Sequence, residues 1–354
     1  LDKFLPFSNI NYRNNIDFDK LITPRFDNVS SCINSIYSDS SYKKPKLHDD
    51  YSCWVFNNGI VRFEYPVSEG DSGCVQMRDM FRELCEYRNI PDMEFFVNRR
   101  DFPLLRKDLT EAYSQLYPPN TSIEEYYTRS SFLPILSMNG NDDYADILIP
   151  TWDDWSRVRS IEDGKFFVKG ARDYRYKLNT DFDTKKEIFV FRGASTGLEV
   201  NHKNPRIGTV LFAKSNKHLP IDAGITKWNM RPRVKWENEK LYFDTFSQNL
   251  KTQVGTVAEM SPEEQSNYKF IISIPGHSFA YRFSLELSFN SVILLVKGNN
   301  IIWYMSQLKE WVHYIPIESD LSNLEECVKW CLNNKEKFKT IANNAYEFYK
   351  NNLS

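Results

Sequence analysis

The apolar and polar positions along the chain alternate between short strand-like runs and helical repeats. Roughly the first 70 residues are rich in Asn, Asp, Ser and Tyr with few periodic apolar stretches, which predicts irregular segments on a domain surface. The run Met93–Val97 predicts a buried strand. From Cys74 onwards, apolar residues recur every three or four positions and predict a helix that buries Met77, Met80, Phe81, Leu84 and Cys85.

Further apolar runs predict strands at residues 146–150, 188–191, 268–274, 292–296 and 312–317. The pattern Ser322-Asn-Leu-Glu325 predicts a capping box that opens a helix. The apolar side of that helix carries Leu324, Val328, Cys331 and Leu332. A last helix is predicted from about residue 335, with Phe338, Ile341, Ala342, Ala345 and Phe348 or Tyr349 facing inward. Strands that alternate with helices in this way predict an α/β fold.

The length of 354 residues exceeds the usual size of one domain core, so we expect two packed domains. The Asp- and Lys-rich stretch at residues 181–187 marks the predicted junction. The N-terminal domain then covers residues 1–183, including the irregular extension, and the C-terminal domain covers residues 184–335. Residues 336–354 form a C-terminal helix that we expect to pack back on the first domain.

The net charge of -2 excludes partners that are attracted by a strong electrostatic field. Forty-five Lys and Arg residues oppose 47 Asp and Glu residues, so neither nucleic-acid binding nor electrostatic membrane binding is expected. No stretch approaches the roughly 18 to 20 apolar residues of a membrane span. The six cysteines have neither the density of a disulfide scaffold nor the paired spacing of a zinc site, which predicts core thiols in a reducing compartment.

Three predicted loops follow strands, where open α/β sheets bind their ligands. The first, residues 98–103, holds Asp101 beside two arginines that favour its ionised form. A carboxylate at a strand end is a candidate general base for a hydroxyl group. The alternative is a solvated salt bridge within the loop.

The second loop, residues 192–197, offers two glycines and two hydroxyl side chains to a phosphate or a ribose, although an ordinary turn is the alternative. It lacks the terminal Lys-Ser/Thr of a P-loop. The third loop, residues 275–282, joins a glycine turn to a predicted helix start. Arg282 and Glu286 would share one face of that helix. This arrangement predicts a diphosphate cradle, with structural helix capping as the alternative.

Metal and triad chemistry are not predicted. None of the five histidines forms a ligand pair or a Ser-His-Asp set by spacing. Asp17-Phe-Asp19 and Asp181-Phe-Asp183 match the D-x-D pattern of metal-dependent glycosyltransferases, but so acidic a chain produces such triplets by chance. A metal-dependent transferase that uses Asp181-Phe-Asp183 remains an alternative.

Five blocks in order resemble glycosyltransferase family 90, which contains the protein O-glucosyltransferases and the capsule-associated xylosyltransferases. They read FFVNRRDFP at residues 95–103, YADILIPTWDDW at 144–155, FRGASTG at 191–197, YKF at 268–270 continuing to Arg282, and WVHYIP at 311–316 followed by DLS at 320–322. The resemblance implies two Rossmann-like domains that face each other across a cleft, the GT-B arrangement. It also implies a UDP-sugar donor, inversion at the anomeric carbon, and no metal or other cofactor.

The resemblance assigns roles to individual residues. Asp101 matches the catalytic aspartate, which takes the proton of the acceptor hydroxyl, and Arg282 matches the arginine on the donor diphosphate. The remaining predicted donor-site residues are Arg192, Gly193, Ser195, Thr196, Gly276, His277, Ser278, Phe279, Ala280, Tyr281 and Glu286. Trp152 and Trp155 fall in a block that borders the acceptor and the sugar, with core packing as the alternative.

The chain departs from the family pattern in two respects. Val200 stands where the protein O-glucosyltransferases carry a further arginine, and Arg206 is our candidate replacement. The disulfide cysteines of the secretory-pathway members and a terminal Lys-Asp-Glu-Leu signal are not recognisable, which predicts a cytoplasmic location. Frequent Asn, Lys, Ile and Tyr suggest an AT-rich genome such as that of a large DNA virus.

The sequence therefore predicts an inverting, metal-independent glycosyltransferase. It would move glucose or xylose from a UDP-sugar to a hydroxyl group of a glycan or protein acceptor. The alternative is a catalytically inactive module that keeps the fold and binds a sugar or a nucleotide.

Overall fold

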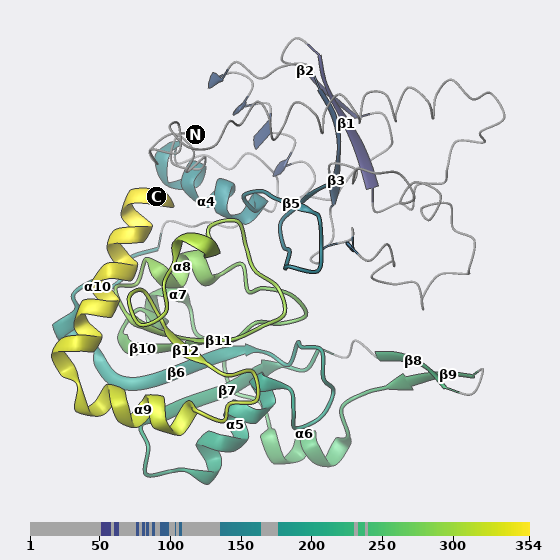
Figure 1. Ribbon diagram of the computed structural model, residues 1–354. Helices are drawn as coiled ribbons and strands as arrows, with labels where there is room; N and C mark the ends of the chain where they lie inside the picture. Colours follow the sequence, from purple (N-terminus) through teal and green to yellow (C-terminus); the bar gives the residue numbers. More distant parts are fainter. Residues whose placement is uncertain are drawn as a thin grey trace. The chain divides into compact units, whose positions relative to one another are not determined.

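The computed structural model describes residues 51–57, 60–63, 76, 77, 80, 81, 83, 84, 87, 88, 93–98, 103, 106, 107, 135–163, 176–229, 233–237 and 240–354. The chain divides into two compact units, Leu1–Tyr174 with Asn300–Trp303, and Arg175–Asn299 with Tyr304–Ser354. Each unit contains a five-stranded sheet, and the second of these sheets is drawn in Figure 1 with helices around it. The predicted α/β fold with parallel strands is confirmed.

The sheet of the first unit has the strand order β2-β1-β3-β4-β5. Its strands are β1 (Tyr51–Asn57), β2 (Ile60–Phe63), β3 (Met93–Asn98), β4 (Ile135–Ser137) and β5 (Ile147–Leu148). β1 runs antiparallel to β2 and β3, whereas β3, β4 and β5 are parallel. The predicted strand at residues 93–97 is confirmed. The expectation of irregular structure is wrong at residues 51–57 and 60–63, because aromatic and β-branched residues there favour strands within a polar stretch of the sequence.

Helix α4 (Trp152–Asp163) of the first unit begins with a cap and a buried ion pair. The Thr151 hydroxyl accepts the Asp154 N–H at 2.9 Å, and Asp154 pairs with Arg157 at 3.2 Å. The indole N–H of Trp303 donates to the same carboxylate at 3.2 Å. Asp154 therefore joins α4 to residues 300–303, which come from a distant part of the chain. Near position 80, Met77, Met80 and Phe81 are helical and buried as predicted, whereas Leu84 is helical but half-buried.

The second unit contains a fully parallel sheet in the order β12-β11-β10-β6-β7. Its strands are β6 (Lys186–Ala194), β7 (Ile221–Lys227), β10 (Tyr268–Ser273), β11 (Val292–Val296) and β12 (Ile315–Ile317). The chain first moves from β6 to β7 and then returns past β6 to β10. The direction of strand addition therefore reverses between β6 and β10, which makes their carboxyl ends the switch point where doubly wound sheets bind ligands.

Two predicted strand bounds are corrected in this sheet. β6 continues to Ala194, so the first three residues of the predicted loop at 192–197 belong to a strand. β12 begins only at Ile315, because the chain turns at Trp311, whose φ of 60° is left-handed.

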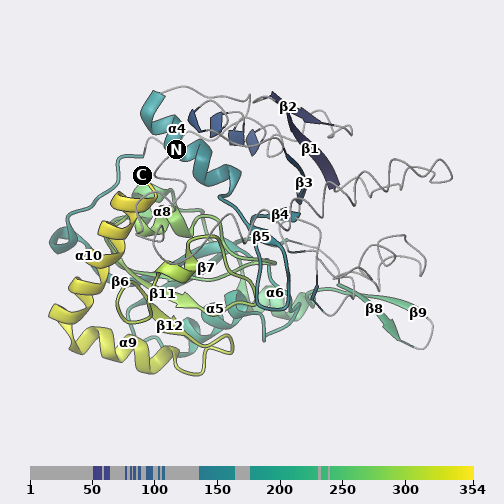
Figure 2. The ribbon, with the colours of Figure 1, turned by 45° about the horizontal axis from the view of Figure 1, so that its top comes forward.

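Helices cover both faces of the second sheet, as Figures 1 and 2 show. The larger core packs α5 (Pro205–Ser215), α6 (Gln248–Val254), α9 (Leu324–Asn333) and part of α10 (Lys335–Asn352) against the sheet. The other face carries α7 (Pro262–Gln265) and α8 (Phe283–Leu287). The remaining elements are the short helices η2 (Phe182–Thr184) and η3 (Met305–Gln307), and a hairpin of β8 (Arg233–Glu237) and β9 (Lys240–Asp244).

The two C-terminal helices have the predicted apolar faces. Phe338, Ile341, Ala342, Ala345, Phe348 and Tyr349 are all buried in α10. This helix packs against α8 and β11 of its own unit, and its packing on the first domain stays a prediction. Cys327 and Cys331 are buried free thiols of α9, as predicted, and burial raises the pKa of both. No helix among the described residues is long and apolar enough to cross a membrane.

The predicted capping box at Ser322 is wrong. Asn323 is the N-cap residue of α9 and makes no side-chain cap bond. Its amide instead accepts the Glu318 N–H at 2.8 Å and donates to the Pro316 carbonyl at 3.1 Å, which fixes the turn after β12. A capping box does form at Ser261 and Glu264, where the same sequence pattern opens α7.

We predict that Asp154→Ala lowers the free energy of unfolding by about 3 to 5 kcal/mol, because it breaks the buried ion pair with Arg157 and the hydrogen bond from Trp303. Urea unfolding would measure the change. Glu325→Ala is the matched control, since the Glu325–Lys329 pair is exposed and its loss should leave the urea midpoint unchanged within error. Equal midpoints for the two variants would contradict a structural role for the buried pair.

Candidate functional site

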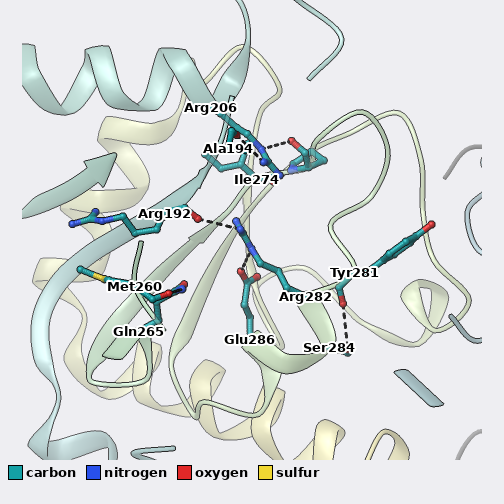
Figure 3. A network of polar contacts seen from close by, with 11 residues as sticks. Arg192, Ala194, Arg206, Met260, Gln265, Ile274, Tyr281, Arg282, Ser284 and Glu286 are labelled. Carbon is teal, nitrogen blue, oxygen red and sulfur yellow. Dashed lines mark hydrogen bonds and ion pairs between the residues drawn. The ribbon is translucent and has the colours of Figure 1, made fainter. Parts of the chain in front are cut away.

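The candidate site lies in the second unit, at the carboxyl ends of β6 and β10. The segment after β6 runs from Ser195 to Asn204, and the segment after β10 runs from Ile274 to Arg282. Figure 3 shows the side chains that meet there. The switch point of the sheet thus brings together the second and third loops predicted from the sequence, which are about 80 residues apart in the chain.

Arg206, the second residue of α5, joins the two strand ends. Its Nη1 donates to the Ala194 carbonyl at 2.9 Å, its Nη2 to Ile274 at 2.8 Å and its Nε to Pro275 at 3.1 Å. Only 7% of the residue is exposed. The guanidinium group therefore balances three carbonyl oxygens that would otherwise present negative charge at the edge of the sheet.

Asn204 places Arg206. Its buried side chain accepts the N–H groups of Arg206 and Ile207 at 3.0 and 3.4 Å, which caps the start of α5. The same amide donates to the Glu199 carbonyl at 2.9 Å and so folds the loop back onto the helix. Gly197 lies so close that a Cβ atom there would be 2.3 Å from the Asn204 amide nitrogen. This tight approach accounts for a glycine in the loop.

Arg282 occupies the start of α8, and two contacts hold its guanidinium group. Nε donates to Oε1 of Glu286 at 2.7 Å, and Nη1 donates to the Arg192 carbonyl at 3.0 Å. Within the described part of the chain, Nη2 has no hydrogen-bond partner, and 30% of the side chain is exposed. The contacts therefore fix the orientation of Arg282 and leave one of its nitrogen atoms for a ligand.

We call Arg206, Arg282 and Glu286 the arginine cluster. Burial, and then the positive charge of Arg282, lower the pKa of Arg206 to about 9, while Glu286 acts in the opposite direction. Glu286 is itself buried, and its Oε2 has no partner among the described residues. Two guanidinium groups thus lie near one carboxylate, and among the described residues the guanidinium group of the buried Arg206 donates only to backbone carbonyl oxygens. An anion would relieve this excess of positive charge.

Thr196 and Gly276 lie beside Arg206, and His277 follows Gly276 in the chain. Donor binding by these three residues stays a prediction. A Cβ atom at Gly276 would be 2.8 Å from the Thr196 hydroxyl oxygen and 3.3 Å from Nη2 of Arg206, so only glycine fits there without displacing a neighbour. His277 Nδ1 lies 3.0 Å from the Gly197 carbonyl oxygen. The loops after β6 and β10 therefore pack directly on each other.

Other predicted donor residues have structural contacts. The guanidinium group of Arg192 binds Asp222 on β7 at 2.7 and 2.8 Å, so only its carbonyl group reaches the cluster. Gly193 lies within β6. Ser195 is buried, and its hydroxyl accepts the Asn229 N–H at 2.9 Å. Donor binding by these three residues stays a prediction, and the contacts of the Arg192 and Ser195 side chains do not favour it.

The residues that lead into α8 form a compact turn. The Gly276 N–H donates to the Ser278 carbonyl at 2.9 Å, and the Phe283 N–H donates to Ala280 at 2.9 Å. Phe279 packs edge-on against Phe283 with ring centroids 5.4 Å apart. Figure 3 shows the side chain of Tyr281 directed away from Arg282. This turn sets the position from which Arg282 starts its helix.

Asp101 lies outside the described residues, so its predicted role stays a prediction. Trp155 is buried, and its indole N–H donates to Glu83 at 2.7 Å. Its contacts are those of core packing, the alternative that the sequence left open. Trp152 is half-buried, and contact of this side chain with a sugar stays a prediction.

The second D-x-D triplet is used structurally. Asp181 caps η2 by accepting the Asp183 N–H, and Asp183 pairs with Lys339 at 2.7 Å. The first triplet, Asp17 to Asp19, lies outside the described residues. In the described ranges no group of three His, Cys, Asp or Glu side chains could hold a metal ion.

Asn204 and Asp222 were not identified from the sequence. An Asn directly before a Pro is a recognised helix start, since Asn caps well and Pro fits the first helical position. That signal was available for Asn204. No sequence signal could have identified Asp222, because its pairing with Arg192 depends on the register of β6 and β7.

The family model described as Glycosyl transferase family 90 matches residues 68–354. "Uncharacterized protein 035R" of Invertebrate iridescent virus 3 is 39% identical, over all of this chain and 32% of that protein. "Protein O-glucosyltransferase 3" of Rattus norvegicus is 27% identical, over 75% of this chain and 44% of that protein. "Protein O-glucosyltransferase 1" of Homo sapiens is 25% identical, over 75% and 58% respectively. The chain therefore spans about a third of the viral relative and less than two thirds of the other two.

We predict that inorganic pyrophosphate raises the melting temperature of the protein, because it binds the arginine cluster, which exists only in the folded state. At 100 times its Kd, a ligand adds about 2.7 kcal/mol of stability. Arg282→Ala should lose most of the thermal shift, since Nη2 of this partly exposed side chain is an unused donor of the cluster. Lys339→Ala removes one exposed positive charge and should keep the full shift. Equal shifts for both variants would place anion binding elsewhere.

Proposed function

The chain belongs to glycosyltransferase family 90, and on that premise we propose that it is an inverting, metal-independent glycosyltransferase that uses a UDP-sugar. The sugar is glucose or xylose, and the acceptor is a hydroxyl group of a glycan or a protein. The arginine cluster at the switch point is the observation that carries this proposal. Its excess positive charge lies where a doubly wound sheet binds the phosphates of a nucleotide.

A diphosphate suits the cluster in charge and in hydrogen bonding. Arg206 neutralises three carbonyl oxygens that would repel a phosphate, and two of its five N–H groups are not used by those bonds. Arg282 offers Nη2 from a side chain that Glu286 and a backbone carbonyl already orient. Charge-assisted hydrogen bonds from preoriented guanidinium groups are among the stronger polar contacts in proteins.

The same charges assist the departure of UDP. When the bond between the anomeric carbon and the donor oxygen breaks, negative charge develops on the β-phosphate. Fixed positive groups at that position stabilise the transition state more than the ground state, since they need no rearrangement. The two arginines would then serve in place of a metal ion. Arg206 would also supply the contact that Val200 cannot make.

The acceptor step is assigned to Asp101. Its carboxylate would take the proton of the acceptor hydroxyl while that oxygen attacks the anomeric carbon from the face opposite UDP, which inverts the configuration. The proton ends on Asp101, the new bond joins the acceptor oxygen to the sugar, and UDP leaves with the electron pair of the broken bond.

The cytoplasmic location expected from the sequence also stays a prediction.

The donor is tested by binding and release. We expect one UDP-sugar of a panel that includes UDP-glucose and UDP-xylose to show binding in calorimetry. The protein should release UDP from the same donor, and the rate of release should be unchanged after addition of EDTA. Loss of activity with EDTA would contradict metal independence. Binding without any release of UDP would support the inactive binding module instead.

Two substitutions separate binding from chemistry. Asp101→Asn should leave UDP affinity nearly unchanged and lower turnover on the order of 10²-fold or more, the scale of lost acid-base catalysis. Arg282→Ala should weaken UDP binding and lower turnover together, because one donor to the diphosphate is lost. Normal turnover in Asp101→Asn would exclude this residue as the base, and unchanged UDP affinity in Arg282→Ala would place the diphosphate elsewhere.

A further inference from the structure

The hairpin of β8 and β9 stands out from the second unit, to which it belongs. In the part of the chain that the structure describes, each of these two strands has its extensive contacts with the other strand alone. Figures 1 and 2 show the hairpin extending away from the sheet and the helices of its unit. A lone two-stranded hairpin is at best marginally stable in water, so this one needs a cover for one of its faces.

The strand register identifies the face that needs the cover. β8 and β9 are antiparallel, with Val234 opposite Phe243 and Trp236 opposite Leu241. Because alternate residues of a strand lie on opposite faces, these four residues share one face. We call it the apolar face, since it contains no polar or charged residue.

The other face of the hairpin is polar and suits contact with water. Its cross-strand pairs are Arg233 with Asp244, Lys235 with Tyr242, and Glu237 with Lys240. Two of these three pairs join opposite charges, and such pairs stabilise antiparallel strands. The hairpin is therefore amphipathic, and its partner binds on the apolar face.

The apolar face is complementary in size to a copy of itself. Trp236 and Phe243 occupy one diagonal of its four positions, and the smaller Val234 and Leu241 occupy the other diagonal. A two-fold axis in the plane between two such faces, along or across the strands, brings each aromatic residue opposite an aliphatic one. Layers that place large residues opposite small ones interdigitate well. The pattern therefore favours a second copy of this chain as the partner.

Charge and area are consistent with a second copy. The apolar face brings no charges together when it meets itself. A covered Trp or Phe buries about 150 to 250 Å², so these two residues alone contribute about 300 to 500 Å² per copy. The smaller stable interfaces bury about 600 Å² per partner, which the two aliphatic residues help to reach. An interface of this size predicts a dimer that dissociates on dilution.

We propose that the chain forms a two-fold symmetric dimer in which the apolar faces of two β8–β9 hairpins pack on each other. The two hairpins become the layers of a small sandwich with a core between them, which supplies the cover that one hairpin lacks. Contacts of a surface with its own copy are the commonest form of dimer interface. The hairpin contains no residue of the arginine cluster, so the dimer is independent of the proposed function.

Sedimentation velocity of the full chain over a concentration series tests the dimer. We expect a reversible equilibrium between monomer and dimer. Trp236→Thr should raise the dimer Kd by about 30-fold or more, the scale expected for an aromatic anchor of an interface. Thr is chosen because it favours strands and so preserves the hairpin. Phe243→Thr changes the same face from the other strand and should also raise the Kd.

Tyr242→Thr is the matched control, because it removes an aromatic residue from the polar face of the same hairpin. It should keep the wild-type dimer Kd. Melting temperatures measured at a concentration where the protein is monomeric should equal that of the wild type, which shows that the variants are folded. A wild-type protein that is monomeric at every concentration would overturn the inference and leave the apolar face to a different partner. A wild-type Kd in both apolar-face variants, or an equal rise in Tyr242→Thr, would overturn it as well.

Discussion

The second unit depends on one buried positive charge. Parallel strands that end at the same edge of a sheet direct carbonyl oxygens into the region where their ligand binds, and at β6 and β10 three of these oxygens converge. Arg206 satisfies all three at distances of 2.8 to 3.1 Å from a position with little exposed surface. The neighbouring features follow from this arrangement. Asn204 places the arginine, Gly276 leaves room for it, and Arg282 stands close enough to lower its pKa.

The excess of positive charge at these strand ends explains why the arginine cluster suits an anion and not a neutral ligand. Glu286 holds Arg282 and opposes the effect of its charge on Arg206, but one carboxylate does not neutralise two guanidinium groups. The proposed nucleotide-sugar donor would give the imbalance a chemical reason, because such a donor brings its own negative charge. The proposed donor therefore completes an ion network that the fold leaves incomplete.

The first unit solves a related problem with neutral and acidic side chains. Its parallel strands also end side by side, but the polar groups there are the amide of Asn98, the hydroxyl of Ser137 and the carboxylate of Asp146, hydrogen-bonded in series. Guanidinium groups attract an anion, whereas this series holds backbone in place.

The sequence by itself determined the fold class, the family and the faces of the strongly periodic elements. Val292–Val296 and the inner face of α10 were predictable because continuous apolar runs and three-to-four-residue repeats reflect local geometry. Local signals failed at β1 and β2, which lie in a polar stretch of the sequence. They also failed at Ser322, where the side chain of the neighbouring Asn323 is used in the turn after β12. Only the tertiary structure decided that Arg206 binds the carbonyl groups of Ala194, Ile274 and Pro275, and that Arg192 turns to Asp222. Those contacts join residues 12 to 69 positions apart, and strand order and register, not local propensity, bring such residues together.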